Sequence, residues 1–209
     1  MQDEHGFIWL AMLEMMDTPL SGRKVLDIGC NRGGFLRLLH DRAEIGSGFG
    51  YDPAPGAIAD AHRLAGARPL TFKVAETVPT DWSGFGAAFS HEVLYVLPDL
   101  ASHAAAVFAA LADGASYFAT IGVHTDSPLM VAWHAEKAAE LELPGPYGLD
   151  EVGDVFEGAG FDVAVGRLPM RFVPVRAHRS DTHADTSLSR WLDYYYRDKV
   201  MFRFTKTRR

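Results

Sequence analysis

A glycine-rich turn beside an acidic residue is the part of this sequence best suited to bind a ligand. Residues 25–35 read VLDIGCNRGGF, in which an apolar run contains Asp27 and continues into Gly29, Asn31 and Gly33. The pattern predicts a strand, a tight turn and a helix, which would place backbone N–H groups and a carboxylate at the carboxyl end of a parallel strand. Open α/β sheets bind their ligands in that crevice.

A second acidic residue follows the next predicted strand. The strand covers residues 47–51 and is followed directly by Asp52. Two carboxylates on adjacent strand ends suit a ligand with an amine at one end and ribose hydroxyls further along. The dinucleotide fingerprint G-x-G-x-x-G differs from this turn, because it brings a pyrophosphate to the helix N-terminus and Asp27 would repel that group. The turn therefore favours a ligand with an ammonium group over a nicotinamide dinucleotide.

The D-x-G-x-N-x-G string, followed by the strand-end Asp52, resembles the class I methyltransferases that use S-adenosylmethionine. That family usually has glycine where this chain has Asn31, and asparagine tolerates a positive φ better than most residues do. The resemblance is specific between about residues 23 and 125 and rests on element order beyond them. It implies S-adenosylmethionine as the methyl donor and S-adenosylhomocysteine as the product.

The resemblance also implies a set of cofactor-binding residues. Asp27 would orient the methionine ammonium group, and Asp52 would accept hydrogen bonds from the ribose hydroxyls. Glu76 would lie at the adenine edge, where it could accept from the exocyclic amine or be an exposed turn residue. The full set is Asp27, Gly29, Cys30, Asn31, Gly33, Asp52, Pro53, Ala75, Glu76, Ser90 and His91.

The sequence defines candidate catalytic residues less clearly than it defines candidate cofactor-binding residues. Methyl transfer from a sulfonium ion is an in-line displacement with an activated leaving group, so the enzyme must align the acceptor and a base is optional. His124 is the first candidate for a general base, because an imidazole titrates near neutral pH, and Tyr95 is the second. A strand-end histidine can also be a hydrogen-bonded structural residue, so both interpretations of His124 stay open.

The nine histidines raise the question of a metal site. His124 and Asp126 could supply ligands, as could a second set formed by His178, His183 and Asp185. The sequence has no H-E-x-x-H motif, no paired cysteines and no repeated carboxylate motif, so we predict no metal site. It also lacks the phosphate-loop and G-x-S-x-G motifs.

Strands and helices alternate along the chain, which predicts a parallel sheet with helices on both faces. The predicted strands are 24–28, 47–51, 70–75, 86–90, 116–123, 161–166 and 200–205. The predicted helices are 4–16, 33–41, 55–65, 99–112, one within 127–143, 149–160 and 187–196. By resemblance, this is an α/β fold with a seven-stranded, mostly parallel sheet and a late antiparallel strand. No linker stands out, so we expect one domain over residues 1–209.

Three segments are predicted to cover the cofactor crevice. They are the leading helix with Phe7, Ile8 and Trp9, the inserted helix with Trp133 and His134, and the aromatic cluster at 191–196. Their aromatic side chains would shape an apolar acceptor pocket, or would pack helices on the sheet. The inserted helix is the best candidate for a lid.

The bulk composition limits the function classes. With 48% hydrophobic and 22% charged residues in a chain of 209, the composition is that of a soluble globular protein. A formal charge of −7 argues against a nucleic acid as the main partner, because such binding neutralises phosphates. The single cysteine, Cys30, excludes an intramolecular disulfide, and we interpret it as a packing residue rather than a redox site. The sequence shows no signal-peptide n-region and no run of eighteen apolar residues, which predicts a cytoplasmic protein without a membrane span.

These features together predict an enzyme that transfers a methyl group from S-adenosylmethionine to a small-molecule acceptor, as a monomer or homodimer. The acidic charge and the lid-like insertions favour a small acceptor. The alternatives are an RNA or protein methyltransferase, a non-catalytic S-adenosylmethionine-binding protein of the same fold, and a nicotinamide oxidoreductase.

Overall fold

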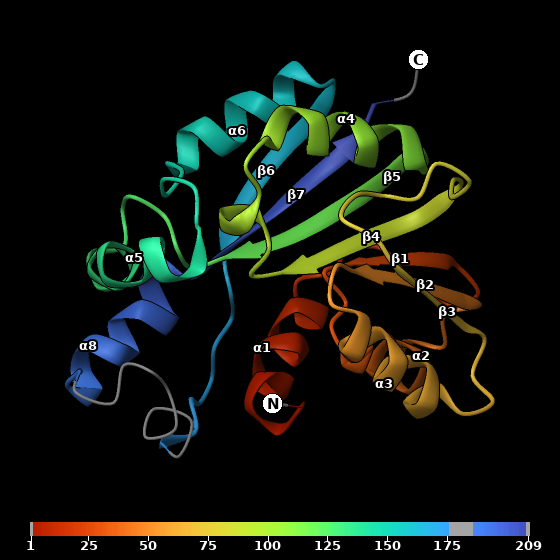
Figure 1. The fold of residues 1–209 in the computed structure, drawn as a ribbon, viewed down its shortest axis with the longest axis horizontal. Coiled ribbons are helices and arrows are strands. Elements are labelled where there is room, and N and C mark those ends of the chain that lie inside the picture. Colours follow the sequence, from red (N-terminus) through yellow and green to blue (C-terminus); the bar gives the residue numbers. More distant parts are fainter. Residues whose placement is uncertain (1, 176–185, 208–209) are drawn as a thin grey trace.

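The computed structural model describes residues 2–175 and 186–207, and within them seven strands form one sheet (Figure 1). The sheet order is β3-β2-β1-β4-β5-β7-β6. Neighbouring strands from β1 to β5 pair in parallel, and β7 is antiparallel to both of its neighbours. The strands are β1 Lys24–Ile28, β2 Ser47–Asp52, β3 Leu70–Val74, β4 Phe85–His91, β5 Leu111–Ile121, β6 Phe161–Arg167 and β7 Val200–Lys206. The predicted fold class is confirmed.

Helices cover both faces of this sheet. Figure 1 shows α4 (Leu100–Ala110) and α6 (Leu149–Gly158) on one face, with α1 (Gln2–Glu14), α2 (Gly34–Ala43) and α3 (Pro55–Ala65) on the other. The remaining helical segments are α5 Pro128–Leu141, α8 Leu188–Asp193, a 3-10 turn at Leu94–Val96 and a π-helical turn at Tyr194–Asp198. No helix in the described ranges combines the length and apolar character that a membrane span requires.

Each face of the central strands has its own apolar core. Phe89 and Phe118 belong to the core under α1, α2 and α3, whereas Tyr117 and Phe204 belong to the core under α4 and α6. Burial on both faces is expected of a largely parallel sheet. Because the strands are anchored on both sides, the segments that follow their carboxyl ends are held in defined positions.

One predicted boundary was wrong. Alanine-rich residues predict a helix to residue 112 and a strand from 116, but α4 ends at Ala110 and β5 begins at Leu111. Leu111 is 2% exposed and pairs with Phe85, and the pairing register shifts before Ala87. Burial of Leu111 in the sheet therefore overrides the helix propensity of the preceding alanines. This is a tertiary effect, which local amino-acid composition cannot predict.

The core under α4 and α6 offers a test of this packing. Phe204 is fully buried, and its ring centroid lies 3.7 Å from that of Phe156 and 5.2 Å from that of Phe202. We expect Phe204→Ala to lower the free energy of unfolding by about 3–5 kcal/mol in urea denaturation, because it removes a buried ring and leaves a cavity. Val165 on neighbouring β6 is 56% exposed, so Val165→Ala should change stability by no more than about 0.5 kcal/mol. Equal effects of the two substitutions would contradict this core.

Candidate active site

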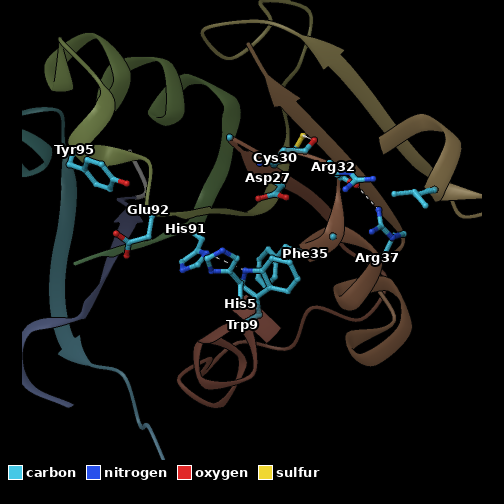
Figure 2. A pocket seen from close by; sticks show the side chains of 14 residues that line it. His5, Trp9, Asp27, Cys30, Arg32, Phe35, Arg37, His91, Glu92 and Tyr95 are labelled. Carbon is cyan, nitrogen blue, oxygen red and sulfur yellow. Dashed lines mark hydrogen bonds between the residues drawn. The ribbon is translucent and has the colours of Figure 1, made fainter. Parts of the chain in front are cut away.

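A cavity of about 460 Å³ lies at the carboxyl ends of β1 and β4 (Figure 2). Its volume falls within the roughly 300–1,000 Å³ that is usual for ligand pockets. The wall combines α1, the end of β1 with the turn and α2 that follow it, one residue of α3, and the end of β4 with the segment after it. Its residues are His5, Trp9, Asp27, Gly29, Cys30, Asn31, Arg32, Gly34, Phe35, Arg37, Leu64, His91, Glu92 and Tyr95.

The turn after β1 depends on left-handed backbone conformations. The φ angles are 66° at Gly29, 47° at Asn31 and 68° at Gly33. A Cβ atom on Gly29 would lie 2.6 Å from Val93 Cγ2, and one on Gly33 would lie 2.6 Å from Phe72 Cζ. Glycine is therefore required at both positions, for conformation and for space. The expected positive φ at Asn31 is confirmed.

Asp52, at the end of β2, holds this turn in place. Its Oδ2 accepts a hydrogen bond from the backbone N–H of Asn31, and its Oδ1 accepts one from the N–H of Ala54, both at 2.9 Å. A carboxylate has about four lone-pair sites, so each oxygen can accept a further bond. Asp52 does not contribute to the cavity wall, and its contact with ribose hydroxyls stays a prediction.

Asp27 is the buried acid of the cavity. Its side chain is 4% exposed, and its Oδ2 has no hydrogen-bond partner within the described residues. Burial, reinforced by the charge of Asp52, raises the pKa of Asp27 well above its usual value. A buried carboxylate without a partner is costly, and a cationic group in the cavity would offset that cost. The cavity therefore suits a ligand with a positively charged amine.

His91 and Trp9 meet on the other side of the cavity. The indole Nε1–H of Trp9 donates to Nδ1 of His91 at 3.3 Å, while Nε2 of His91 is buried without a partner among the described residues. Burial lowers the pKa of His91 well below its usual value, and the charges of Lys199 and His5 lower it further. The imidazole of His91 is therefore neutral at neutral pH.

Glu92 forms a buried ion pair next to His91. Its Oε1 accepts from Lys199 Nζ at 2.6 Å, and its Oε2 accepts from the backbone N–H of Gly122 at 3.2 Å. The side chain of Lys199 is 2% exposed, and its Nζ lies 5.1 Å and 5.6 Å from the ring centroids of Tyr194 and Tyr195. Glu92 also has a φ of 59°, which is unusual for a non-glycine residue and is typical of functional sites.

A second cavity, of about 210 Å³, adjoins the first. The two share four wall residues: His5, His91, Glu92 and Tyr95. The rest of its wall is mostly aromatic and apolar and comprises Ile8, Val123, Met130, Trp133, Tyr194, Tyr195 and Lys199. Each of the three segments predicted to cover the crevice contributes at least one aromatic residue to these walls. His134 lines neither cavity. Its Nε2 donates a hydrogen bond to the backbone oxygen of Pro144 at 2.6 Å.

Tyr95 is the second residue that sequence analysis named as a candidate base. It lines both cavities, and its ring centroid is 6.2 Å from that of Trp133. Burial, together with the charge of Glu92, raises the pKa of the Tyr95 hydroxyl. At neutral pH this hydroxyl can donate a hydrogen bond but is a poor base.

His124 lies outside the walls of both cavities. Its Nε2 donates to the backbone oxygen of Asp198 at 2.7 Å, and its Nδ1 is 3.9 Å from Asp126 Oδ2. The imidazole thus ties the end of β5 to the π-helical turn before β7. This position favours the structural interpretation of His124, and its role as a base stays a prediction.

The sequence-predicted cofactor residues divide into four groups. Asp27, Gly29, Cys30, Asn31 and His91 line the cavity. Gly33 and Asp52 shape the turn after β1 but do not line the cavity. Pro53, Ala75 and Glu76 follow the ends of β2 and β3 and do not line the cavity either. Ser90 is fully buried, and its hydroxyl is hydrogen-bonded at 2.6 Å to the hydroxyl of Tyr117, a residue of the core under α4 and α6.

Sequence reasoning missed seven wall residues of the larger cavity: His5, Arg32, Gly34, Phe35, Arg37, Leu64 and Glu92. Glu92 carried a usable signal, since it follows His91 at a strand end. Arg37 carried a weaker sequence signal, because it is a charged residue within the apolar run of α2. In the structure it is 8% exposed. The others become neighbours only through tertiary packing.

Cys30 is buried beside the turn. Burial raises the pKa of its thiol, and the charges of Asp27 and Asp52 raise it further. A protonated, buried thiol is unreactive, which supports the interpretation of Cys30 as a packing residue.

The described part of the chain has no cluster of three or more histidine, cysteine or acidic side chains arranged to hold a metal ion. Of the residues weighed as metal ligands, His178, His183 and Asp185 lie outside the described residues.

A family model described as a methyltransferase domain matches residues 8–164. No curated protein sequence matches the chain. The chain belongs to the methyltransferase domain family, and its fold is that of the class I, S-adenosylmethionine-dependent enzymes, as the resemblance of the β1 turn implied.

Solved structures share this fold at low sequence identity. One chain comes from a complex between the Haloferax volcanii Trm112 methyltransferase activator and a protein described as a methyltransferase; it is 19% identical, with a TM-score of 0.83 over 100% of this chain and 92% of that one. Haemonchus contortus phosphoethanolamine N-methyltransferase 2 with S-adenosylmethionine is 20% identical, with a TM-score of 0.72 over 96% of this chain and 52% of that one. Streptomyces coelicolor geranyl diphosphate C-methyltransferase is 14% identical, with a TM-score of 0.76 over 97% and 79%.

The raised pKa of Asp27 predicts a pH dependence of stability. An acid whose pKa is higher in the folded state contributes stability below its unfolded pKa and loses that contribution as pH rises through the folded pKa. The wild type should therefore lose free energy of unfolding relative to Asp27→Asn as pH rises from about 4 to about 9 in urea titrations without ligand. Asp113, which is 64% exposed on its side chain, provides the control variant Asp113→Asn, which should show no such trend. If the free energy of unfolding of Asp27→Asn instead fell relative to that of the wild type as pH rises, the buried state of the Asp27 carboxyl group would be contradicted.

Proposed function

We propose that this protein transfers a methyl group from S-adenosylmethionine to a small-molecule acceptor bound in the 210 Å³ cavity. The observation that carries the proposal is the wall shared by the two cavities. On one side lies the buried carboxyl group of Asp27, whose Oδ2 has no hydrogen-bond partner in the part of the chain that the structure describes. On the other side lies an aromatic chamber. A donor and an acceptor held in adjoining cavities meet the alignment requirement of an in-line transfer.

The residues of the larger cavity fit the cofactor. The ammonium group of the methionine moiety would pair with Asp27, and the tight turn at Gly29 and Asn31 would let the ligand approach the backbone. Asp52 retains acceptor capacity for the ribose hydroxyls. When bound, S-adenosylmethionine supplies an activated sulfonium methyl group.

The chain's own residues contribute alignment and exclusion of water more than base catalysis. The raised pKa of Tyr95 keeps its hydroxyl protonated, and Glu92 is already paired with Lys199. Trp133 of α5 and Tyr194 and Tyr195 of the π-helical turn line the chamber in which the acceptor would lie. His5 and Ile8 of α1 lie in the same wall. Orientation of the reacting atoms can account for a large part of the rate enhancement of such a reaction.

Three observations support a small acceptor. The second cavity is smaller than the roughly 300–1,000 Å³ usual for ligand pockets, and the net charge of −7 opposes RNA binding. Two neighbours of the fold are named for small substrates, phosphoethanolamine and geranyl diphosphate. An RNA or protein acceptor and a non-catalytic cofactor-binding role are the alternatives.

The proposal extends to the organisation of the protein. We propose one domain over residues 1–209, in the cytoplasm, acting as a monomer or homodimer. The Haloferax neighbour was solved with the Trm112 activator, so a protein partner is the alternative. Size-exclusion chromatography with light scattering on the purified chain measures whether it is stable and monodisperse alone.

Calorimetric titration with S-adenosylmethionine, S-adenosylhomocysteine and NADH is the direct test of the cofactor. We expect binding of the first two and none of NADH, and binding of NADH alone would overturn the proposal. Formation of S-adenosylhomocysteine is then measured with a panel of small acceptors and with total RNA. Turnover with RNA alone would favour the nucleic-acid alternative, and binding without turnover on either panel would favour the non-catalytic one.

Asp27→Asn tests the recognition of the ammonium group. A hydrogen bond to a charged group contributes about 1.5–3 kcal/mol, so the substitution should weaken S-adenosylmethionine binding about 10- to 100-fold. 5′-Methylthioadenosine lacks the amino-acid portion, so its affinity should be the same for both proteins. The exposed-site variant Asp113→Asn is the matched control. A parallel loss for both ligands would mean that Asp27 supports the turn and does not contact the ammonium group.

His124→Ala separates the two interpretations of that residue. We expect a lower free energy of unfolding, because the bond from His124 to the backbone oxygen of Asp198 is lost, and nearly full turnover by the folded protein. A general base would instead show a loss of about 10²–10⁴-fold in kcat with unchanged cofactor affinity. Urea denaturation and steady-state kinetics on the same preparation distinguish the two results.

A further inference from the structure

His91 occupies the junction between the two cavities. It belongs to the walls of both, and Figure 2 shows its ring with Trp9 on one side and Glu92 on the other. The imidazole of His5 meets it edge-on, with ring centroids 5.1 Å apart. A group at this position lies between the donor and the acceptor of the proposed reaction.

The bond from Trp9 determines which nitrogen of His91 carries the proton. An indole N–H can only donate, so Nδ1 of His91 must offer its lone pair. A neutral imidazole has one N–H, which is then on Nε2. The lowered pKa of His91 supports the neutral form, and the charged or titratable groups around it are His5, Glu92 and Lys199.

This tautomer makes His91 a donor and excludes it as a base. Nε2 already carries a proton, and the lone pair of Nδ1 is occupied by Trp9. The Nε2–H is buried and has no partner within the described residues. A buried donor without an acceptor is costly, so a ligand oxygen that accepts from Nε2 would be favoured.

The wall of the smaller cavity indicates what carries that oxygen. Tyr95, Trp133, Tyr194 and Tyr195 surround the space, and aromatic walls favour a flat aromatic ligand. Beside His91, the Glu92 carboxylate can accept a hydrogen bond in addition to its two present ones. A donor and an acceptor side by side match a hydroxyl group, which both accepts and donates.

We propose that the acceptor is a small hydroxylated aromatic compound whose oxygen accepts a hydrogen bond from Nε2 of His91, with Trp9 as the positioning residue that holds the required tautomer. The proposal rests on the proposed methyl transfer. Methylation of such a hydroxyl forms a carbon–oxygen bond as the carbon–sulfur bond breaks. The electron pair of the broken bond stays on sulfur, giving a neutral thioether. The hydroxyl proton leaves along its hydrogen bond to the Glu92 carboxylate and from there reaches bulk water.

The first experiment measures the tautomer. Long-range ¹⁵N–¹H spectra of labelled protein at neutral pH should show His91 as the neutral Nε2–H form, with His91→Gln identifying its signals. Trp9→Phe removes the N–H that donates to Nδ1, and should bring a second tautomer or an imidazolium signal. A wild-type His91 protonated at Nδ1, or charged, would overturn the proposal.

The second experiment measures ligand recognition in protein saturated with S-adenosylhomocysteine. Phenol and toluene have nearly the same shape, and only phenol offers an oxygen. Wild type should bind phenol several-fold to about tenfold more tightly than toluene, by NMR titration. His91→Leu should remove this preference, and His91→Gln, which keeps an N–H near Nε2, should retain it. Trp9→Phe should reduce it.

The outcomes separate this inference from the proposed function. If S-adenosylhomocysteine does not bind, the methyltransferase proposal fails before any phenol is added. If it binds and phenol does not, or if His91→Leu keeps the preference for phenol, the assignment of His91 is overturned. Should His91→Leu fail to fold, the tautomer of the wild type and the behaviour of His91→Gln still decide the matter.

Discussion

The pair of hydrogen bonds accepted by Asp52 is the constraint on which the site depends. One carboxylate oxygen binds the N–H of Asn31 and the other binds the N–H of Ala54, so a single side chain joins the turn after β1 to the start of α3. The turn that it joins holds three residues in the left-handed conformation, Gly29, Asn31 and Gly33. Beside this turn, Asp27 is buried, and its Oδ2 has no hydrogen-bond partner within the described residues, which is a specific signal for a ligand.

The charged groups in the walls of the two cavities differ in whether they have a partner of opposite charge. In the larger one the carboxylate of Asp27 lacks a counter-charge, and the raised pKa of this acid records the cost. In the smaller one the charges of Glu92 and Lys199 compensate each other under two tyrosine rings. A cationic cofactor and a neutral acceptor are the ligands that this distribution of charge favours. His91 lies between them as a neutral group.

Solved structures with the same fold differ widely from this chain in sequence. Chains that are only 14–20% identical to this one keep the same fold, so the fold tolerates wide sequence change. The smaller cavity is lined in part by α1, α5 and the π-helical turn, which add to the strand–helix alternation. Segments of this kind can vary while the sheet is retained, which is why fold alone does not define the acceptor.

The sequence by itself determined the alternation of elements, the strand-end acids and the left-handed turn, because periodicity, glycine and asparagine act locally. It did not determine the end of α4, where burial of Leu111 in the sheet outweighs alanine propensity. Nor did it bring Trp9 onto His91, 82 positions away, or pair Glu92 with Lys199 across 107 positions. Those contacts exist only when the sheet order places β4 beside β5 and β5 beside β7, with α1 packed over their ends. Tertiary structure therefore decided which histidine lines the cavities: His91 reaches both, whereas His124 is bonded to the backbone outside them.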